Sequence, residues 1–372
     1  MTRTFRLLLA VGAGAVGLVL AGSSAAHTSA KVPMYIGGKE PSLTVEQSSY
    51  KIGAAATVDF FIFSDPSNEA TAKMTIFSPA GYSTNIGQAP GTKLGGAVAF
   101  VKVGALAGSI LPLAGPVIVG NPADSALQTA SLKCTGSPTS QAIWVLHTSL
   151  QGQTIDVPDF VNKVGPYLVQ QICLTAPQDP SNTNQAQLVS ADYNVNGVFT
   201  NPSARGGYQW AGDFTPYING TTTVNPAGTT EWRTYDGIPQ SLTMKRVKLR
   251  KLKSGVSVTF AGALAVAGLN PTGIKLDLYA GAKARPAPNV TSGGNGKQVS
   301  RTRALKANGK YSITRKVKKK TFFQIRFENY GVLGSCQGAS PSGLPLALCK
   351  GTDLAPITGP QIKVVRPKKK RR

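Results

Sequence analysis

Val256-Ser257-Val258-Thr259-Phe260, followed by Ile274-Lys275-Leu276-Asp277-Leu278 and Phe323-Gln324-Ile325-Arg326-Phe327, decides the fold of this chain. In each run apolar residues alternate with polar ones, and this period of two places one face of a β-strand against a core and the other in solvent. Asn308-Gly309 precedes a further run of this kind, and Asn-Gly favours the positive φ angles of a hairpin turn. The stretch from Lys245 to Glu328 is therefore predicted to be a set of β-strands.

The remainder of the chain also has the composition of a β-rich protein. It contains 41 glycines and 25 prolines in 372 residues, and no window keeps a helical period for three turns. Many short strands with frequent turns are typical of all-β proteins. We expect an all-β fold with two antiparallel, immunoglobulin-like β-sandwich domains in tandem. One would cover residues 31–242, and a basic one with a C-terminal disulfide loop would cover residues 243–365.

The first thirty residues, 1–30, have the features of a secretory signal peptide. Arg3 and Arg6 precede an apolar run from Leu7 to Ala21, which is shorter than the roughly 20 residues that a membrane-spanning helix needs. Small residues suit cleavage after Ala26, and Ala30 offers a second site. We therefore expect export to the extracellular space or the cell envelope, with no transmembrane segment in the mature chain.

Charge divides the chain into unequal halves. Residues 31–242 contain 10 Lys plus Arg and 13 Asp plus Glu, a net charge of −3, whereas residues 243–372 contain 28 and 3, a net charge of +25. Such asymmetry indicates a polyanionic partner for the C-terminal half, and anionic cell-envelope polymers or lipid headgroups are nearer to an exported protein than nucleic acid. Alternatively, the lysines serve solubility and discourage edge pairing.

Two lysine-rich segments are the predicted polyanion-binding residues. One is a triplet before the strand at Phe323, and the other is the basic tail over residues 366–372. A flexible cationic end attracts phosphate groups as a set of point charges. The predicted site comprises Lys318, Lys319, Lys320, Arg366, Lys368, Lys369, Lys370, Arg371 and Arg372.

The four cysteines predict disulfides, because an exported chain meets an oxidising environment. Four cysteines allow three pairings. We favour Cys134 with Cys173 and Cys336 with Cys349, since each pair then stays within one region. Trp144 lies between the first two, and this order resembles the immunoglobulin pattern, in which a tryptophan packs on an inter-sheet disulfide.

Three motifs of the C-terminal half carry a family resemblance. They are Val256-Ser257-Val258-Thr259-Phe260-Ala261-Gly262, Gly273-Ile274-Lys275-Leu276-Asp277-Leu278-Tyr279 and Ala307-Asn308-Gly309-Lys310-Tyr311-Ser312-Ile313-Thr314. This segment resembles the bacterial immunoglobulin-like and carboxypeptidase-regulatory-like modules of exported actinobacterial proteins, and the N-terminal region resembles secreted proteins of that group only as a type. The resemblance implies a β-sandwich that acts as a spacer, an adhesive unit or a carbohydrate-contacting module.

No zinc pattern, phosphate-binding glycine loop or nucleophile elbow points to catalysis, and no cofactor is expected. The leading hypothesis is a non-catalytic cell-surface or wall-associated protein. One alternative is copper binding: cleavage after Ala26 would make His27 the N-terminus, and His147 is the only partner histidine. Another is a carbohydrate-binding module built on Tyr208, Trp210 and Trp232, although a hydrophobic core also explains these aromatic residues.

Overall fold

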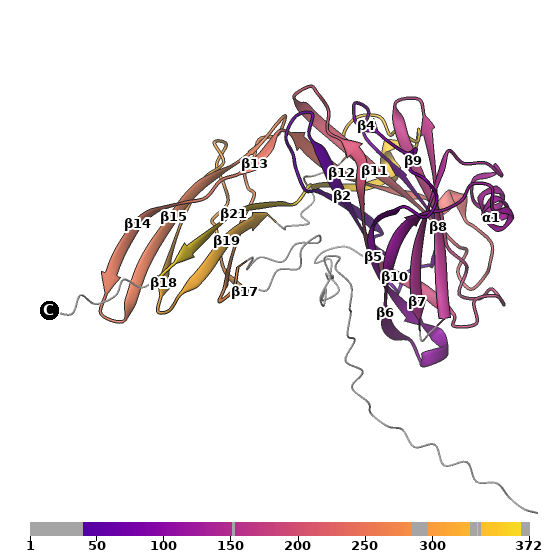
Figure 1. Cartoon of the computed structure of the whole chain (residues 1–372), viewed down its shortest axis with the longest axis horizontal. Coiled ribbons are helices and arrows are strands. Elements are labelled where there is room, and N and C mark those ends of the chain that lie inside the picture. Colours follow the sequence, from indigo (N-terminus) through magenta and orange to yellow (C-terminus); the bar gives the residue numbers. More distant parts are fainter. Residues whose placement is uncertain (1–39, 151–152, 285–296, 328–332, 334–335, 366–372) are drawn as a thin grey trace, which may run out of the picture.

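The computed structural model of the chain describes residues 40–150, 153–284, 297–327, 333 and 336–365. Over these residues the chain forms 21 β-strands, one α-helix and three short 3₁₀ helices. The strands gather into two bodies (Figure 1). The larger is a single sheet whose opposite parts pack in a sandwich-like manner, and the smaller is two sheets that pack on each other. The predicted all-β fold is therefore confirmed.

The larger body is one sheet of 13 strands. Its strands are β1 (Ser42–Gln47), β2 (Ala55–Phe63), β3 (Thr71–Phe77), β4 (Ser83–Thr84), β5 (Lys93–Val103), β6 (Ser109–Val119), β7 (Ala142–Leu150), β8 (Gln153–Val164), β9 (Tyr167–Cys173), β10 (Ala186–Thr200), β11 (Gly206–Pro216), β12 (Thr230–Ile238) and β20 (Cys349–Leu354). They lie in the order β1-β2-β10-β5-β6-β7-β8-β9-β3-β11-β12-β20, with β4 paired to β10. Only the β12–β20 pair is parallel among these strands.

The sheet curls until its first strand meets its far end. The Thr234 hydroxyl of β12 donates to the Leu43 carbonyl (2.8 Å) and accepts from the Val45 N–H (3.2 Å) of β1. The inner face of the curl is apolar, and at its centre the Phe60 ring stacks on Tyr193 at 5.0 Å and meets Trp210 edge-on at 5.5 Å. One core thus lies between opposite parts of a single sheet.

The one α-helix of the described chain, α1 (Ser125–Thr135), lies on the outside of this sheet. The Asp124 side chain caps it by accepting from two N–H groups of the first turn, and Gly136 ends it with a φ of 79°. Cys134 of α1 is disulfide-bonded to Cys173 of β9. The 3₁₀ helices are η1 (Gly104–Leu106), η2 (Pro226–Gly228) and η3 (Leu346–Leu348).

Trp144 does not pack on this disulfide. Its indole lies in the main core, whereas Cys134 belongs to a separate cluster with Ile143 and Val145. Successive residues of a strand point to opposite faces, so β7 separates the tryptophan from the disulfide. In this respect the immunoglobulin-like interpretation of the Cys, Trp, Cys order is wrong.

The smaller body consists of two sheets of four strands. One contains β13 (Gln240–Leu242), β14 (Lys245–Leu252), β15 (Gly255–Val266) and β18 (Lys310–Val317), and the other contains β16 (Asp277–Gly281), β17 (Lys297–Arg301), β19 (Thr321–Phe327) and β21 (Ile357–Val364). Val256, Val258 and Phe260 of β15 are fully buried, as their alternation predicts. The Phe260 ring meets Phe323 of the other sheet at 5.0 Å, so the two sheets share one core.

Two strands lie across the predicted division between residues 242 and 243. β13 precedes the division but pairs with β15 of the smaller body, and β20 follows it but pairs with β12 of the larger body. The loop before β20 is closed by the disulfide between Cys336 and Cys349. The chain therefore passes between the two bodies more than once, and its division into two domains remains a prediction.

A buried ion pair joins the two bodies. Both guanidinium Nη atoms of Arg326 in β19 donate to the Glu46 carboxylate in β1, at 2.9 and 2.8 Å, and both side chains are at least nine-tenths buried. Two further contacts flank the pair, since the Tyr50 hydroxyl donates to the Pro356 carbonyl (2.6 Å) and Gln240 Nε2 donates to the Ala355 carbonyl (2.9 Å). The contact between the bodies thus includes geometrically specific polar bonds, beside apolar packing of Tyr50, Ile238 and Leu354 on the smaller core.

Arg326→Met should destabilise the protein by about 3–5 kcal/mol, because it leaves the Glu46 carboxylate buried without a counter-charge. Urea unfolding followed by tryptophan fluorescence measures this loss. In the double variant Glu46→Met/Arg326→Met no charge remains to be neutralised, so most of the stability should return. A single variant as stable as the parent would contradict the assigned role of the pair.

Candidate polyanion-binding surface

β14 carries more cations than any other strand of the described chain. Its sequence is KRVKLRKL, and every residue from Lys245 to Lys251 is exposed. The strand pairs only with β15, so it forms an edge of its sheet. An edge strand with both faces in water keeps its cationic side chains in solvent. The cations of β14 are Lys245, Arg246, Lys248, Arg250 and Lys251.

The acidic residues of the same region do not reach the surface. Among the described residues after 242, the two acidic ones are Asp277 and Asp353, which are 3% and 0% exposed. Arg301 binds Asp277 through two nitrogens at 2.6 and 3.0 Å, and Trp232 donates to Asp353 at 3.1 Å. Apart from Arg301, which pairs with Asp277, the exposed lysines and arginines of the described C-terminal part face solvent with no carboxylate of that part bonded to them.

The predicted triplet Lys318, Lys319 and Lys320 is exposed in the turn between β18 and β19. This turn and the β14–β15 turn lie at the end of the smaller body that is farthest from the large sheet (Figure 1). Val364 of β21 pairs with Thr321, so the chain leaves its last strand at the same end. Around Phe322, Lys320 Nζ lies 5.4 Å and Lys363 Nζ 6.0 Å from the ring centroid, within cation–π range.

The other predicted cations, Arg366, Lys368, Lys369, Lys370, Arg371 and Arg372, lie outside the described residues, and their part in polyanion binding stays a prediction. Sequence reasoning did not single out β14 as a binding element. The sequence did contain a signal for it, because its cations occupy both odd and even positions and so lie on both faces of the strand. Only an edge strand keeps both faces in water.

The copper alternative has one describable residue. His147 in β7 lies with its Nδ1 atom 2.6 Å from Asp156 Oδ1 of β8, and both side chains are about half exposed. His27 lies outside the described residues. Within the described part of the chain, no three His, Cys, Asp or Glu side chains are grouped closely enough to hold a metal ion.

The aromatic residues expected to form a sugar-binding platform are core residues. Trp210 is 0% and Trp232 3% exposed, and Tyr208 is partly buried with its ring edge-on to Tyr82. Stacking on a sugar ring needs an exposed aromatic face. The carbohydrate-binding alternative built on Tyr208, Trp210 and Trp232 is therefore wrong.

The same tryptophans donate to buried carboxyl groups. Asp236 Oδ2 accepts from Trp210 Nε1 (2.6 Å), Gln47 Nε2 (2.5 Å) and the Tyr82 hydroxyl (3.0 Å). Burial raises the pKa of Asp236 to about 7, although these three hydrogen bonds act in the opposite direction. Burial likewise raises the pKa of Asp353 to about 7. Asp236 and Asp353 are both fully buried, so they serve as acceptors for core donors rather than as groups of an open site.

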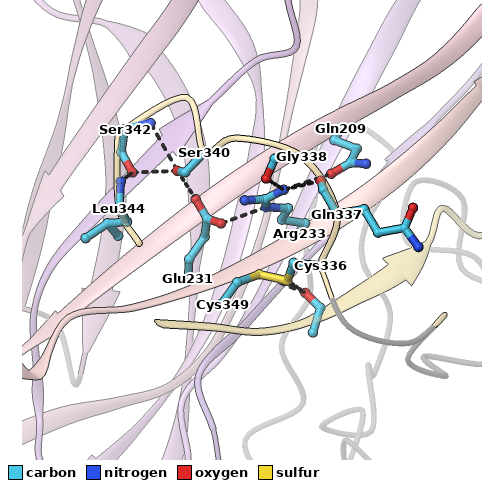
Figure 2. A network of polar contacts seen from close by, with 11 residues as sticks. Gln209, Glu231, Arg233, Cys336, Gln337, Gly338, Ser340, Ser342, Leu344 and Cys349 are labelled. Carbon is cyan, nitrogen blue, oxygen red and sulfur yellow. Dashed lines mark hydrogen bonds and ion pairs between the residues drawn. A yellow bond between two sulfur atoms is a disulfide. The ribbon is translucent and has the colours of Figure 1, made fainter. Parts of the chain in front are cut away.

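A second polar network fastens the disulfide loop onto β12 (Figure 2). Arg233 donates to Glu231 (2.7 Å) and to the Gln337 carbonyl (2.7 Å), and both side chains of this ion pair are buried. The Ser340 hydroxyl of the loop donates to the other oxygen of Glu231. Beside it, burial raises the pKa of Asp213 to about 7. The network is structural, because its two charged groups, Glu231 and Arg233, are buried and bonded to the loop and to each other.

A cavity of about 260 Å³ lies where the two bodies meet, with Glu46, Tyr50, Asp59 and Thr358 in its wall. Glu46 is neutralised by Arg326. Burial, together with the nearby Asp192 and Glu46 carboxylates, raises the pKa of Asp59 well above its ordinary value. The cavity wall thus combines a paired carboxylate with a carboxyl group of raised pKa, and it lacks the cluster of cations found on the outer surface.

No family model matches the chain, and no curated protein matches it. The search of solved structures gives 21 matching chains, among them the full-length major pilin SpaD from Corynebacterium diphtheriae. That match is 11% identical in sequence, covers 77% of this chain and has a TM-score of 0.24. The matched part spans 56% of the pilin chain. We draw no conclusion about fold or function from a likeness of this size.

The helix content of the described residues also bears on membrane insertion. None of the helices in this part of the chain has both the length and the apolar character needed to cross a bilayer.

The stability of the protein should fall as pH rises from about 4 to about 7. Asp213, Asp236 and Asp353 have pKa values near 7 when folded and an ordinary value of 3.8, so the folded chain binds more protons within this window. Each group contributes a slope of at most about 1.4 kcal/mol per pH unit, and the slope disappears above the folded pKa. Urea unfolding at intervals between pH 4.5 and 8.5 measures it.

Asp236→Asn provides the control, because it keeps an acceptor oxygen for the three donors but removes the titrating proton. Its stability should vary less with pH than that of the parent. A parent protein that becomes more stable between pH 5 and 7 would contradict the raised pKa values.

Proposed function

We propose that this chain is an exported, non-catalytic protein of the cell surface, and that its smaller body associates with anionic polymers of the cell wall. The observation that carries the proposal is the exposed cationic edge strand β14, in a region whose described acidic residues are all buried. Without carboxylates at the surface, the positive potential is not cancelled locally.

The arrangement of the cations suits an extended partner. β14 is held along its length by β15, and the turn with Lys318, Lys319 and Lys320 continues the charge at the far end of the same body. A polymer with many phosphates can contact both elements together, and each contact releases a bound counterion. Such binding depends on charge density and on salt rather than on one recognised sugar.

The larger body holds the smaller one in place. The Glu46–Arg326 pair and the hydrogen bond from Tyr50 to the Pro356 carbonyl fix their contact, so a surface-bound smaller body would display the larger one in a defined orientation. The two disulfides fit an extracellular protein. The signal peptide over residues 1–30 and removal of the segment at Ala26 are part of the proposal.

The mature protein should bind purified cell walls at low ionic strength and be released by salt. Neutralising Lys318, Lys319 and Lys320 to glutamine should lower the slope of log K against log salt by about 2 to 3, since each phosphate contact contributes about 0.7–0.9. Deletion of residues 366–372 should weaken binding further and leave the folding transition unchanged. Sedimentation with cell walls at graded salt concentrations measures both effects.

A matched control changes the same number of charges at the opposite end of the smaller body. Lys275, Arg303 and Lys306 are exposed there, at the end of the body where residues 266–268 contact the large sheet. Their triple glutamine variant should keep the parental salt slope. Binding only to anionic lipid vesicles would assign the surface to headgroups instead. Failure to bind either at low salt would reduce the charge to a solubility device and refute the proposal.

A further inference from the structure

The outer face of the sheet β14-β15-β18 is built from small residues flanked by cations. Residues of β15 that alternate with the buried ones are Ser257, Thr259 and Ala261, and they are partly exposed. The strands on either side place longer side chains next to them. The face therefore has a low centre along β15 with positively charged side chains along its flanks.

Register places these side chains in rows across the three strands. Ser257 lies opposite Arg250 on one side and Lys316 on the other, so the first row reads Arg250, Ser257, Lys316. Directly opposed residues of antiparallel strands lie about 4.5–5.5 Å apart between Cα atoms. Both cations are exposed and long enough to reach over the serine. An anion above Ser257 would meet a guanidinium, an ammonium and a hydroxyl donor.

The next row repeats the arrangement one step along the sheet. It contains Lys248, Thr259 and Thr314, and the two threonine hydroxyls are 2.9 Å apart. Residues two apart on a strand are about 6.6–6.8 Å apart. A third row, Lys245 with Ala261 and Ser312, continues the series. Each row therefore offers at least one cation and one hydroxyl. The step is two residues along β15 and β18, whereas on β14 a bulge between Arg246 and Lys248 separates the second cation from the third.

The chemistry of the face discriminates between anionic polymers. The aromatic neighbours on these strands, Phe260 and Tyr311, are buried on the other face, and no member of the three rows is aromatic or acidic. A polymer of acidic sugar rings would lack a stacking platform here. The face offers only charge and hydrogen-bond donors, which match the several acceptor oxygens of phosphate.

We infer that the outer face of β14-β15-β18 is a binding site for a linear phosphodiester polymer with short polyol units between its phosphates, and that successive phosphates occupy successive rows. The inference rests on the proposed function and adds a ligand class and a location. Arg250 and Lys316 bind the phosphate charge in the first row, while the Ser257 hydroxyl donates to a phosphate oxygen. The polymer lies along β15.

Binding of the full mature protein to poly(glycerol phosphate) of defined length tests the inference, with polyglutamate of equal charge as comparator. The parent should prefer the phosphodiester. Arg250→Gln/Lys316→Gln should lose at least tenfold in affinity at 50 mM salt and lower the salt slope by about 1.5. The matched pair Lys275→Gln/Lys306→Gln carries the same charge change away from this face and should retain parental binding.

Ser257→Ala separates hydrogen bonding from charge, because it alters no charge at all. Loss of a hydroxyl donor to an anion should weaken phosphodiester binding by about threefold to tenfold and leave polyglutamate binding unchanged. Equal losses in the row pair and the matched pair, no effect of Ser257→Ala, or equal affinity for both polymers would each overturn the inference. In those cases salt-dependent wall binding by the parent would still support the proposed function, whereas a parent that binds no polyanion would refute both.

Discussion

The buried pair of Glu46 and Arg326 is the contact on which the arrangement of the whole molecule depends. Both charges are largely buried, so each is neutralised by the other, and the bidentate geometry restricts the relative position of β1 and β19. The hydrogen bonds of Tyr50 and Gln240 to the segment before β21 agree with that position. This specific polar contact lies beside apolar packing, because Tyr50, Ile238 and Leu354 of the larger body belong to the core cluster of the smaller body.

Acidic and basic residues differ in burial as well as in their position along the sequence. Most of the acidic residues behind the −3 of residues 31–242 are buried, among them Glu46, Asp59, Asp159, Asp192, Asp213, Glu231 and Asp236. Several have raised pKa values or are paired with arginine, so they contribute little negative potential outside. The surface of the larger body is thus less acidic than its composition indicates, and it does not compete for the cations of the smaller body.

The alternating runs at Val256 and Phe323 were sufficient to predict β15 and β19, because each buries one face, whereas the run at Ile274 forms a strand only from Asp277 onward. Long-range pairing could not be predicted in this way. β20 joins β12 in parallel more than a hundred residues away, and no local pattern encodes that choice. Asp124 and Gly136 are residues of the types that cap helices, but the helix between them has no clear apolar face. Its sequence therefore lacked the periodic signal that predicts a helix. Trp210 and Trp232 show why binding sites were harder to predict than strands. A cluster of aromatic residues in the sequence does not indicate whether the rings lie in a core or on the surface.

The return of β20 into the large sheet has a consequence for how the chain responds to proteolysis. The backbone passes between the bodies three times: from β12 to β13, from β19 to β20, and from β20 to β21. A protease that cuts any one of these connections leaves two intact, and the strands on either side of the cut remain paired in their sheets. A nicked molecule thus stays in one piece, and the two bodies part only when a second and a third connection are cut or a whole sheet unfolds.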